Sequence, residues 1–346
     1  MLHPSADSSW FTFEVPPAKG FRVYAFTGTE EVHKPYEFDI ELVHESADVD
    51  FASLLGQPAC LSVADRSGGV RHVHGVIRSF TQLHTANLRT HYRCMLVPRL
   101  WFMGQTTDHR IFQNMSVTRI IEQILKEQNF TGDSYAFRCF FDYAPREYCV
   151  QYGETSLHFI SRLCEEEGIY FYFEHFEDRH VLCFSDREGG PRIHGESDLR
   201  FHPGAGTETD TATVRSVELN QAVGSDSVTF REWNFEKTRL NLQVGQVETN
   251  AVAAPVPAGM TLEDYRYPHL YQLQNEGKRY ADIEMLRHLS PTRTIESRTD
   301  VSRMTPGHTF ELREHVRQEL NARWWVVGVE HRGEQPQVLE HEAPDR

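Results

Sequence analysis

The sequence predicts a mainly β fold into which α/β and helical segments are inserted. Short runs of alternating apolar and polar residues fill the first hundred positions and return after residue 213, whereas helical periodicity is confined to a few segments between them. Aromatic residues, which pair well across strands, make up 12% of the chain. The order along the chain is therefore β-rich, α/β, β-rich, a small helical piece and β-rich again.

The N-terminal region, residues 10–104, is predicted to be a succession of short strands. In "YEFDIELV", Tyr36, Phe38, Ile40 and Leu42 alternate with acidic residues, so this strand has one apolar face and one polar face. Similar segments are "WFTFEV", "FRVYAF", "CLSVAD", "VRHVHGVIRSFTQL" and "HYRCMLVP", separated by turn-forming pieces such as "PPAKG" and "RSGG". Many short strands without a long helix indicate an antiparallel barrel or a sandwich.

Residues 105–190 predict an inserted α/β lobe that begins with a helix. Apolar residues at helical spacing place this helix near 117–128. Ser116 precedes it, and its hydroxyl can cap the helix start. Gly132 follows where a terminating glycine is expected.

The lobe continues with a second helix, expected near 156–167. Thr155 or Ser156 can cap its start. Gly168 can end it, because glycine tolerates the left-handed backbone that follows many helix ends. The segments "IYFYFEH" and "HVLCFSD" then predict a hairpin over 169–185.

The C-terminal half is again β-rich, after a connector of glycine, proline, threonine and charged residues. Strand patterns such as "TVRSVEL", "DSVTFREWNF", "TFELR" and "RWWVVGVEHRG" fall within 191–245 and 295–335. Between them, 246–294 contains the proline-rich "AVAAPVPAG" and a short helical pattern. Three apolar residues recur there at helical spacing: Tyr280, Ile283 and Leu286.

Composition limits the classes of partner. The formal net charge is -15 and no dense basic block is present, so nucleic acid is not an expected partner. No apolar run approaches the ~20 residues needed to cross a bilayer, and the N-terminus lacks the features of a signal peptide. Six scattered cysteines without a CxxC pair indicate buried thiols in a reducing compartment: Cys60, Cys94, Cys139, Cys149, Cys164 and Cys183.

The glutamate run at the end of the second helix is the first candidate for chemistry. Paired-carboxylate catalysis needs the two groups to face each other across a substrate. Glu165, Glu166 and Glu167 instead follow one another around a helical turn and should fan outward. We therefore expect a solvated or interface face, not a catalytic pair.

The histidine pair His72 and His74 is the second candidate. The two residues flank Val73 in a predicted strand and would share a face, which can begin a metal site. No third ligand is nominated by the sequence. The stretch "GAGTET" lacks the third glycine of a dinucleotide loop, and no GxSxG or HExxH motif occurs. We thus expect no catalytic, cofactor-binding or metal-ligating residues.

The segment "REYCVQYGETSLHFISRLCEEEGIYFYFEH" resembles the signature segment of the VgrG family, the spike proteins of bacterial type VI secretion systems. Further segments resemble that family in family order, among them "YEFDIELV", "HGVIRSF", "YRCMLVPRLWFM", "RIFQNMSVTRIIEQIL", "YRYPHLY" and "MTPGHTFELREH". The matching signature positions are Arg146-Glu147, Gln151-Tyr152-Glu154, Phe159-Ser161-Arg162-Leu163, Glu166-Glu167-Gly168-Ile169 and Tyr172-Phe173-Glu174-His175.

The resemblance implies a fold like that of a phage tail hub, with two related antiparallel β-barrels. The barrels would be 10–104 and 191–245 plus 295–335, with 105–190 as the inserted α/β lobe and 246–294 as a helical insertion. Two barrels per chain let three chains form a pseudo-sixfold ring that docks on a sixfold tube. Four residues are then candidates for the core of the lobe: Phe159, Leu163, Tyr170 and Tyr172.

The implied function is structural and non-catalytic. Such a hub caps the inner tube and carries a spike and effectors into target cells. The implied partners are two further copies of the chain, an Hcp-type inner tube hexamer, baseplate proteins, and effectors or adaptors. Such hubs assemble in the bacterial cytoplasm without a signal peptide. Contraction then secretes them to the extracellular space or into a target cell.

Two other interpretations stay open at the level of sequence. The first is a hub of a contractile phage tail or of an extracellular injection system. The second, weaker one is a metal-dependent hydrolase built around His72 and His74. Family members continue into a C-terminal spike, so 336–346 are expected to begin the linker to it. Because that spike intertwines three chains, a trimer is expected of the full-length assembly, with a monomer as the alternative for this segment alone.

Overall fold

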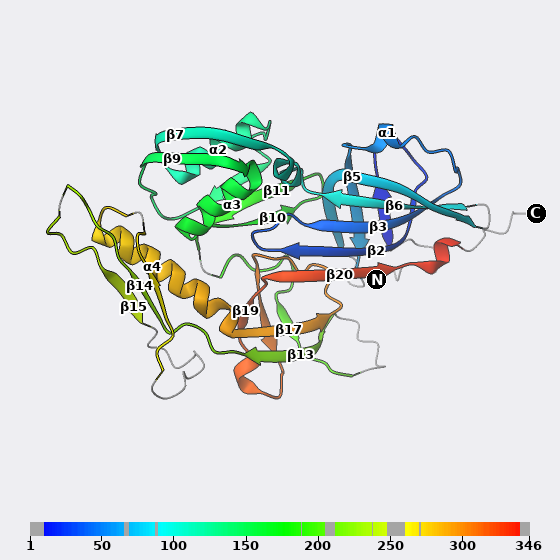
Figure 1. The fold of residues 1–346 in the computed structure, drawn as a ribbon. Coiled ribbons are helices and arrows are strands. Elements are labelled where there is room, and N and C mark those ends of the chain that lie inside the picture. The colour runs from blue at the N-terminus through cyan, green and yellow to red at the C-terminus, as the bar shows by residue number, and fades with distance from the viewer. Residues whose placement is uncertain are drawn as a thin grey trace, which may run out of the picture. The chain divides into compact units, whose positions relative to one another are not determined.

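The structure is a computed structural model, shown in Figure 1, in which the chain divides into two compact units. The first unit comprises Met1–Cys164, Ile169–Thr213 and Asp300–Arg346, and the second comprises Glu165–Gly168 and Val214–Thr299. The residues described are 10–65, 69–86, 89–187, 189–204, 212–236, 238–247, 260–269 and 271–339.

Six strands of the first unit close into an antiparallel barrel, which decides between the barrel and the sandwich that the sequence left open. The sheet order is β1-β4-β5-β6-β3-β2, and β1 also pairs with β2. A seventh strand, β20 (Gly328–Glu334), lies beside β2 on its other edge (Figure 1). The barrel strands are β1 (Phe11–Glu14), β2 (Arg22–Glu31), β3 (Glu37–His44), β4 (Pro58–Ala64), β5 (Val70–Ala86) and β6 (Arg89–Val97), with a short helix α1 (Phe51–Leu54) between β3 and β4.

The apolar face predicted for "YEFDIELV" is the barrel core. Phe38, Ile40 and Leu42 of β3 are all buried, as is Tyr36 just before the strand. The neighbouring strand approaches so closely that a Cβ at Gly28 would overlap the Phe38 ring. Glycine is therefore required at this position for the aromatic ring to lie over the strand backbone.

The inserted lobe contains two helices and two small sheets. Helix α2 (Val117–Glu127) and helix α3 (Ser156–Glu167) occupy the positions expected from the sequence. One sheet pairs β7 (Thr107–Met115) with β9 (Arg146–Thr155), after the short helix η1 (Arg99–Gln105). The other has the order β10-β11-β8, formed by β8 (Tyr135–Arg138), β10 (Tyr170–His175) and β11 (His180–Ser185).

The predicted lobe core and helix caps are mostly found. Phe159, Leu163 and Tyr172 are buried, and Tyr170 is partly buried. Thr155 caps α3, since its Oγ1 accepts from the backbone N–H of His158 at 3.1 Å. Two details differ. Ser116 stands at the start of α2, but its hydroxyl makes no cap and lies 3.2 Å from that of Thr118.

The remaining strands form three small sheets. The first unit holds β12-β18-β19, and the second holds β13-β17 and β15-β14-β16. The division into a second barrel over 191–245 plus 295–335 stays a prediction. The bounds are β12 (Asp198–Arg200), β13 (Val214–Gln221), β14 (Ser227–Phe230), β15 (Val244–Val247), β16 (Glu263–Arg266), β17 (Arg293–Thr299), β18 (Thr309–Arg313), β19 (Arg323–Trp325), and the 3-10 helices η2 (Ser290–Thr292), η3 (Gln318–Leu320) and η4 (Pro336–Leu339).

The helix of the second unit, α4 (Gln274–Leu289), buries a different face from the predicted apolar stripe. Leu286 is 50% exposed, whereas Ala281 and Met285 are buried. A Cβ at Gly277 would overlap the Tyr271 ring, so small residues let this aromatic side chain pack against the helix. Close packing through small residues therefore selects the buried face.

Candidate functional site

The histidine pair on β5 does not converge on a common point. The rings of His72 and His74 stack with centroids 6.2 Å apart. Nδ1 of His72 lies 3.0 Å from the Ser62 hydroxyl. Nε2 of His74 lies 3.0 and 3.1 Å from the carbonyl oxygens of Phe176 and Glu177. His74 therefore ties the barrel to the turn between β10 and β11. Nδ1 of His72 and Nε2 of His74 thus contact different groups and do not face a shared ligand position.

The three glutamates at the end of α3 do not all point outward. Glu165 and Glu166 are exposed, as predicted, but Glu167 is only 5% exposed. Within the second unit, its carboxylate pairs with Arg279 and lies 3.5 Å from the Tyr280 hydroxyl. The prediction of an outward fan is therefore wrong for Glu167. A guanidinium partner compensates the burial of this charge.

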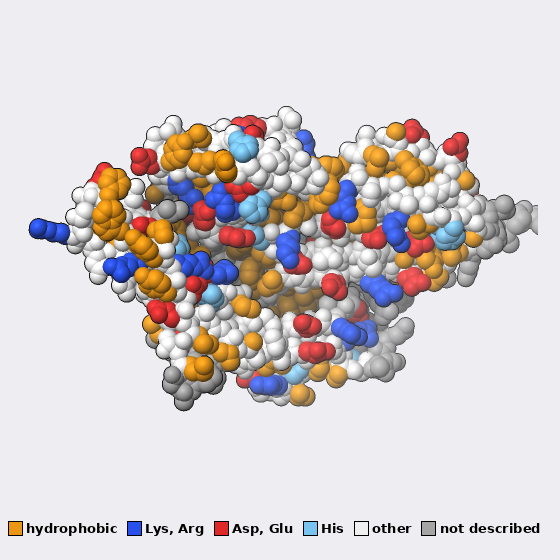
Figure 2. All heavy atoms as spheres, in the orientation of Figure 1, with side chains coloured by type: hydrophobic (Ala, Val, Ile, Leu, Met, Phe, Trp, Pro, Cys, Tyr) orange, Lys and Arg blue, Asp and Glu red, His pale blue; other side chains and the backbone are white. Residues whose placement is uncertain are grey.

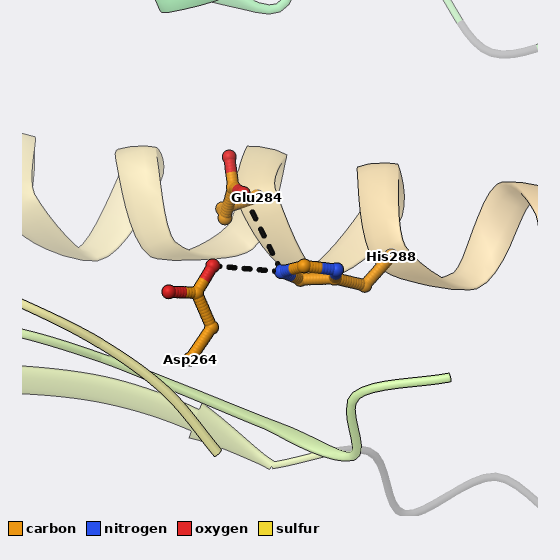
Figure 3. Close-up of side chains that lie close together, drawn as sticks. All are labelled: Asp264, Glu284 and His288. Carbon is orange, nitrogen blue, oxygen red and sulfur yellow. Dashed lines mark hydrogen bonds and ion pairs between the residues drawn. The ribbon is translucent and has the colours of Figure 1, made fainter. Parts of the chain in front are cut away.

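The second unit contains a cluster that the sequence analysis missed. Asp264, Glu284 and His288 each place one donor atom within 4.8 Å of the others (Figure 3). Glu284 and His288 are four residues apart on α4 and so lie on one helix face, while Asp264 comes from the facing strand β16. Nε2 of His288 is 2.8 Å from Oδ2 of Asp264 and 3.4 Å from Oε1 of Glu284. Two carboxylates and one imidazole are a donor set that suits zinc.

Two arginines already occupy the same oxygen atoms. Nη2 of Arg266 lies 2.7 Å from Oδ2 of Asp264 and also pairs with Oε1 of Glu284. Nε of Arg287 donates to that same Oε1 at 2.9 Å. Burial raises the pKa of Asp264, but hydrogen bonds from Arg266 and His288 outweigh this effect and lower it to about 2. Two guanidiniums thus balance two carboxylates, and the cluster fastens α4 to β16 without needing a cation.

A second charge cluster lies inside the first unit and was also missed. The Glu30 side chain is 4% exposed and pairs with Arg71, whose side chain is 9% exposed. Nε2 of His331 lies 2.8 Å from Oε1 of Glu30, and Nε2 of His175 lies 3.9 Å from Oε2. Burial raises the pKa of Glu30, but Arg71 and His331 together hold it far below its usual range. This buried carboxylate joins β2, β5 and β20 in the barrel wall.

A cavity of about 590 Å³ opens in the first unit next to this cluster. Both arginines of its lining are engaged with protein groups: Arg71 donates to the carbonyl oxygens of Ser302 and Met304 at 3.0 Å, and Arg303 donates to that of Glu196 at 2.8 Å. These contacts hold the lining in place. We assign no chemistry to this cavity.

Two stretches named in the sequence analysis fall largely outside the described residues. Residues 205–209 of the "GAGTET" stretch and residues 340–346, the end of the expected linker, lie outside the described residues. Among the helices of the described ranges, none has both the length and the apolar character that crossing a membrane requires. On the face shown in Figure 2, acidic and basic side chains are interspersed.

The described part of the chain thus contains a closed antiparallel barrel and two charge clusters in which arginines neutralise the carboxylates. The chain matches the phage tail baseplate hub (GPD) family over residues 29–337 and belongs to this family. It is 38% identical over 320 residues to the type VI secretion system spike protein VgrG4b of Pseudomonas aeruginosa. The predicted resemblance to the VgrG spike proteins is thereby confirmed.

The relatives differ in how much of their own length this chain covers. The alignment with VgrG4b covers 92% of this chain but 38% of that protein, so the chain spans well under half of this relative's length. A solved Escherichia coli component of the type VI secretion system, itself similar to the bacteriophage tail proteins gp27 and gp5, superimposes with a TM-score of 0.71 at 21% identity, over 94% of this chain and 73% of that one. A prophage tail protein from Shewanella oneidensis superimposes with a TM-score of 0.65 at 11% identity, over 94% and 95%. The predicted mainly β, hub-like fold is confirmed.

Proposed function

We propose that this chain is the hub of a type VI puncturing tip, which caps the inner tube and carries a spike and effectors into target cells. The observation that carries this proposal is the match to the baseplate hub family over residues 29–337, together with 38% identity to a type VI spike protein. A hub must present rigid faces to a symmetric partner. The closed barrel of the first unit supplies such a frame.

The proposed role is mechanical, and the charge clusters support it. Asp264 and Glu284 are neutralised by arginines, and Glu30 by Arg71. Carboxylates held in this way are poor general bases, because their lone pairs are already used in hydrogen bonds. For Asp264 and Glu30 the pKa is also lowered. We accordingly propose no catalytic, cofactor-binding or metal-ligating residue for this chain.

The proposed partners follow from ring geometry. Three copies, each with two barrels, would offer six similar faces to an Hcp-type hexamer. Baseplate proteins would surround this ring, and effectors or adaptors would travel with it. Assembly would take place in the cytoplasm, with release to the extracellular space or a target cell on contraction.

The experiment is co-assembly with an Hcp-type tube protein. Three chains of 40.1 kDa, 120.3 kDa in total, should co-elute with one tube hexamer and give that added mass by light scattering. The chain alone is measured in parallel across a range of concentrations. A chain that stays at 40.1 kDa and fails to retain the hexamer at every concentration tested would contradict the proposal.

A hub of a contractile phage tail or an extracellular injection system is the second candidate. The TM-score of 0.65 with a prophage tail protein favours it. The 38% identity to a spike protein favours the secretion system. Secretion assays separate the two: release of the chain from intact cells should require the contractile sheath of the type VI system.

A further inference from the structure

The barrel of the first unit has one weak joint. Strands β1 and β4 pair at four positions, from Phe11↔Val63 to Glu14↔Cys60. Strands β1 and β2, which close the barrel, pair only at Thr12↔Arg22. A single pair between two strands leaves backbone groups on both sides that need other hydrogen-bond partners. Something else must complete this joint.

The side chain of Gln335 completes it. Its Oε1 accepts from the backbone N–H groups of Trp10 at 2.8 Å and Phe11 at 3.1 Å. Its Nε2 donates to the backbone carbonyl oxygens of Phe11 at 3.2 Å and Val23 at 3.0 Å. A primary amide offers two lone pairs and two N–H groups, and all four are used here. Gln335, at 1% exposure, thus bonds to β1 and β2 as a strand backbone would.

The residues on both sides of Gln335 hold it in this position. Before it, β20 pairs with β2 at seven positions, from Ala25↔Glu334 to Glu31↔Gly328. Its own backbone N–H donates to Tyr24 at 2.8 Å. After it, the buried Val338 in η4 accepts a hydrogen bond from Arg89 of β6 through its carbonyl oxygen. The amide is therefore fixed from both ends, as a positioned group must be.

We propose that residues 328–339 form a clasp that closes the first barrel, and that Gln335 is the positioning residue of this clasp. The barrel strands lie near the start of the chain, but their closure depends on a segment more than 300 residues later. The barrel can therefore close completely only when residues 328–339 have folded onto it. Any longer protein that continues from this point is attached at the barrel joint itself. The clasp does not depend on the proposed place in secretion.

The test replaces the amide without removing its volume. Gln335→Met keeps a similar shape and loses all four hydrogen bonds. Gln337→Met, at an exposed position two residues away, is the matched control. Amide hydrogen exchange by mass spectrometry or NMR is compared between the two variants and the wild-type chain.

The clasp predicts that the effect spreads beyond the groups that Gln335 touches. Exchange should speed up roughly tenfold to a hundredfold at Trp10 and Phe11, and also at Ser62 and Ala64, the β4 residues whose backbone amides face β1. The control should match the wild type. Faster exchange confined to Trp10 and Phe11, or no change at all, would overturn the proposal, since the amide would then only cap the chain start.

A second variant keeps the proposal testable if Gln335→Met does not fold. Gln335→Glu keeps the acceptor but has no donor while its carboxyl group is ionised. On protonation it regains one O–H donor, so its excess exchange over the wild type at the same pH should shrink as pH falls from 7 to 5. An excess that is independent of pH would contradict the role of the donor.

Discussion

The two charge clusters described above both pair carboxylates with arginines, but they differ in how deeply their side chains are buried. In the first unit, Glu30 and Arg71 have side chains that are 4% and 9% exposed. In the second unit, Glu284 is 12% exposed, but its partner Arg287 is 61% exposed. A buried pair loses much more when one partner is removed than an exposed one does, because the remaining charge stays desolvated. The comparison therefore predicts unequal costs for chemically similar changes.

Removing Arg71 should have the largest effect. Arg71→Met leaves the buried Glu30 carboxylate with only the imidazoles of His331 and His175 beside it and no permanent counter-charge, which costs about 3–5 kcal/mol of unfolding free energy. Urea denaturation followed by circular dichroism measures this cost. The matched change in the second unit, Arg287→Met, should cost no more than ~1 kcal/mol, since its side chain is largely in water. Equal costs for the two variants would remove the distinction by depth.

A double variant separates the lost charge from the lost packing. Glu30→Gln combined with Arg71→Met removes both charges of the pair. It should be less destabilised than Arg71→Met alone, because no unpaired charge is then buried. If the double variant is no more stable than the single one, the packing of the Arg71 side chain and its hydrogen bonds to the carbonyl oxygens of Ser302 and Met304, and not its pairing with Glu30, account for the cost.

Acidification should be the next largest effect, and it should begin in the first unit. Burial lowers the pKa values of His175 and His331 below 6.5, and lowers the pKa of His180 to about 4. Between pH 6.5 and the folded pKa, the unfolded chain binds more protons than the folded one, so stability falls as pH falls. At pH 5, His180 alone should cost about 2 kcal/mol.

The pH profile itself provides the measurement. In the second unit, the carboxyl group of Asp264 has its pKa lowered to about 2, so its contribution is lost only as pH falls below the unfolded value of 3.8. Denaturation midpoints are measured from pH 7 to pH 4 for the wild type and for His180→Phe, which removes the titrating group. The variant should lose less stability than the wild type over this range. Parallel profiles would contradict this prediction, since they would show that His180 has the same pKa in the folded and the unfolded chain.

Within the second cluster, removing Glu284 should have a smaller effect. Glu284→Gln leaves Arg266 paired with Asp264 and keeps a hydrogen-bond acceptor, so we expect a cost of about 1 kcal/mol. Amide exchange along α4 should rise locally. Exposed Asp282 on the same helix provides the control as Asp282→Asn. A cost as large as that of Arg71→Met would place the second cluster with the buried one.

The sequence predicted local features better than it predicted these clusters. The alternation around Phe38, the helix ends at Thr155 and Gly168, and the family signature depend on neighbours in sequence, and the structure has them as expected. Glu30 and His331 lie some 300 residues apart, and no period in the sequence connects them. Ser116 shows the converse: a residue of the right type at a helix start whose hydroxyl lies by Thr118 instead.

The cluster of Asp264, Glu284 and His288 in the second unit had one local signal in the sequence. Glu284 and His288 are spaced four apart on a predicted helix, which places them on one face. Asp264, by contrast, joins them only through packing of the helix on the sheet. The buried face of α4 was also mispredicted, because a stripe of large residues was favoured over the small Gly277 and Ala281 that allow close packing.

The smallest expected effect, no effect at all, tests whether the second cluster is an ion-pair network. Zinc should not raise the melting temperature of the wild-type chain, since Arg266 and Arg287 already occupy Oδ2 of Asp264 and Oε1 of Glu284.

Replacing both arginines with methionine should free these oxygens beside Nε2 of His288. The double variant should then gain stability with zinc in a concentration-dependent way, as ligand binding to the folded state requires. The same double variant with His288→Ala should lose that gain. A zinc-dependent rise already present in the wild type would show that the guanidiniums yield to the metal, and that depth alone does not distinguish the two clusters.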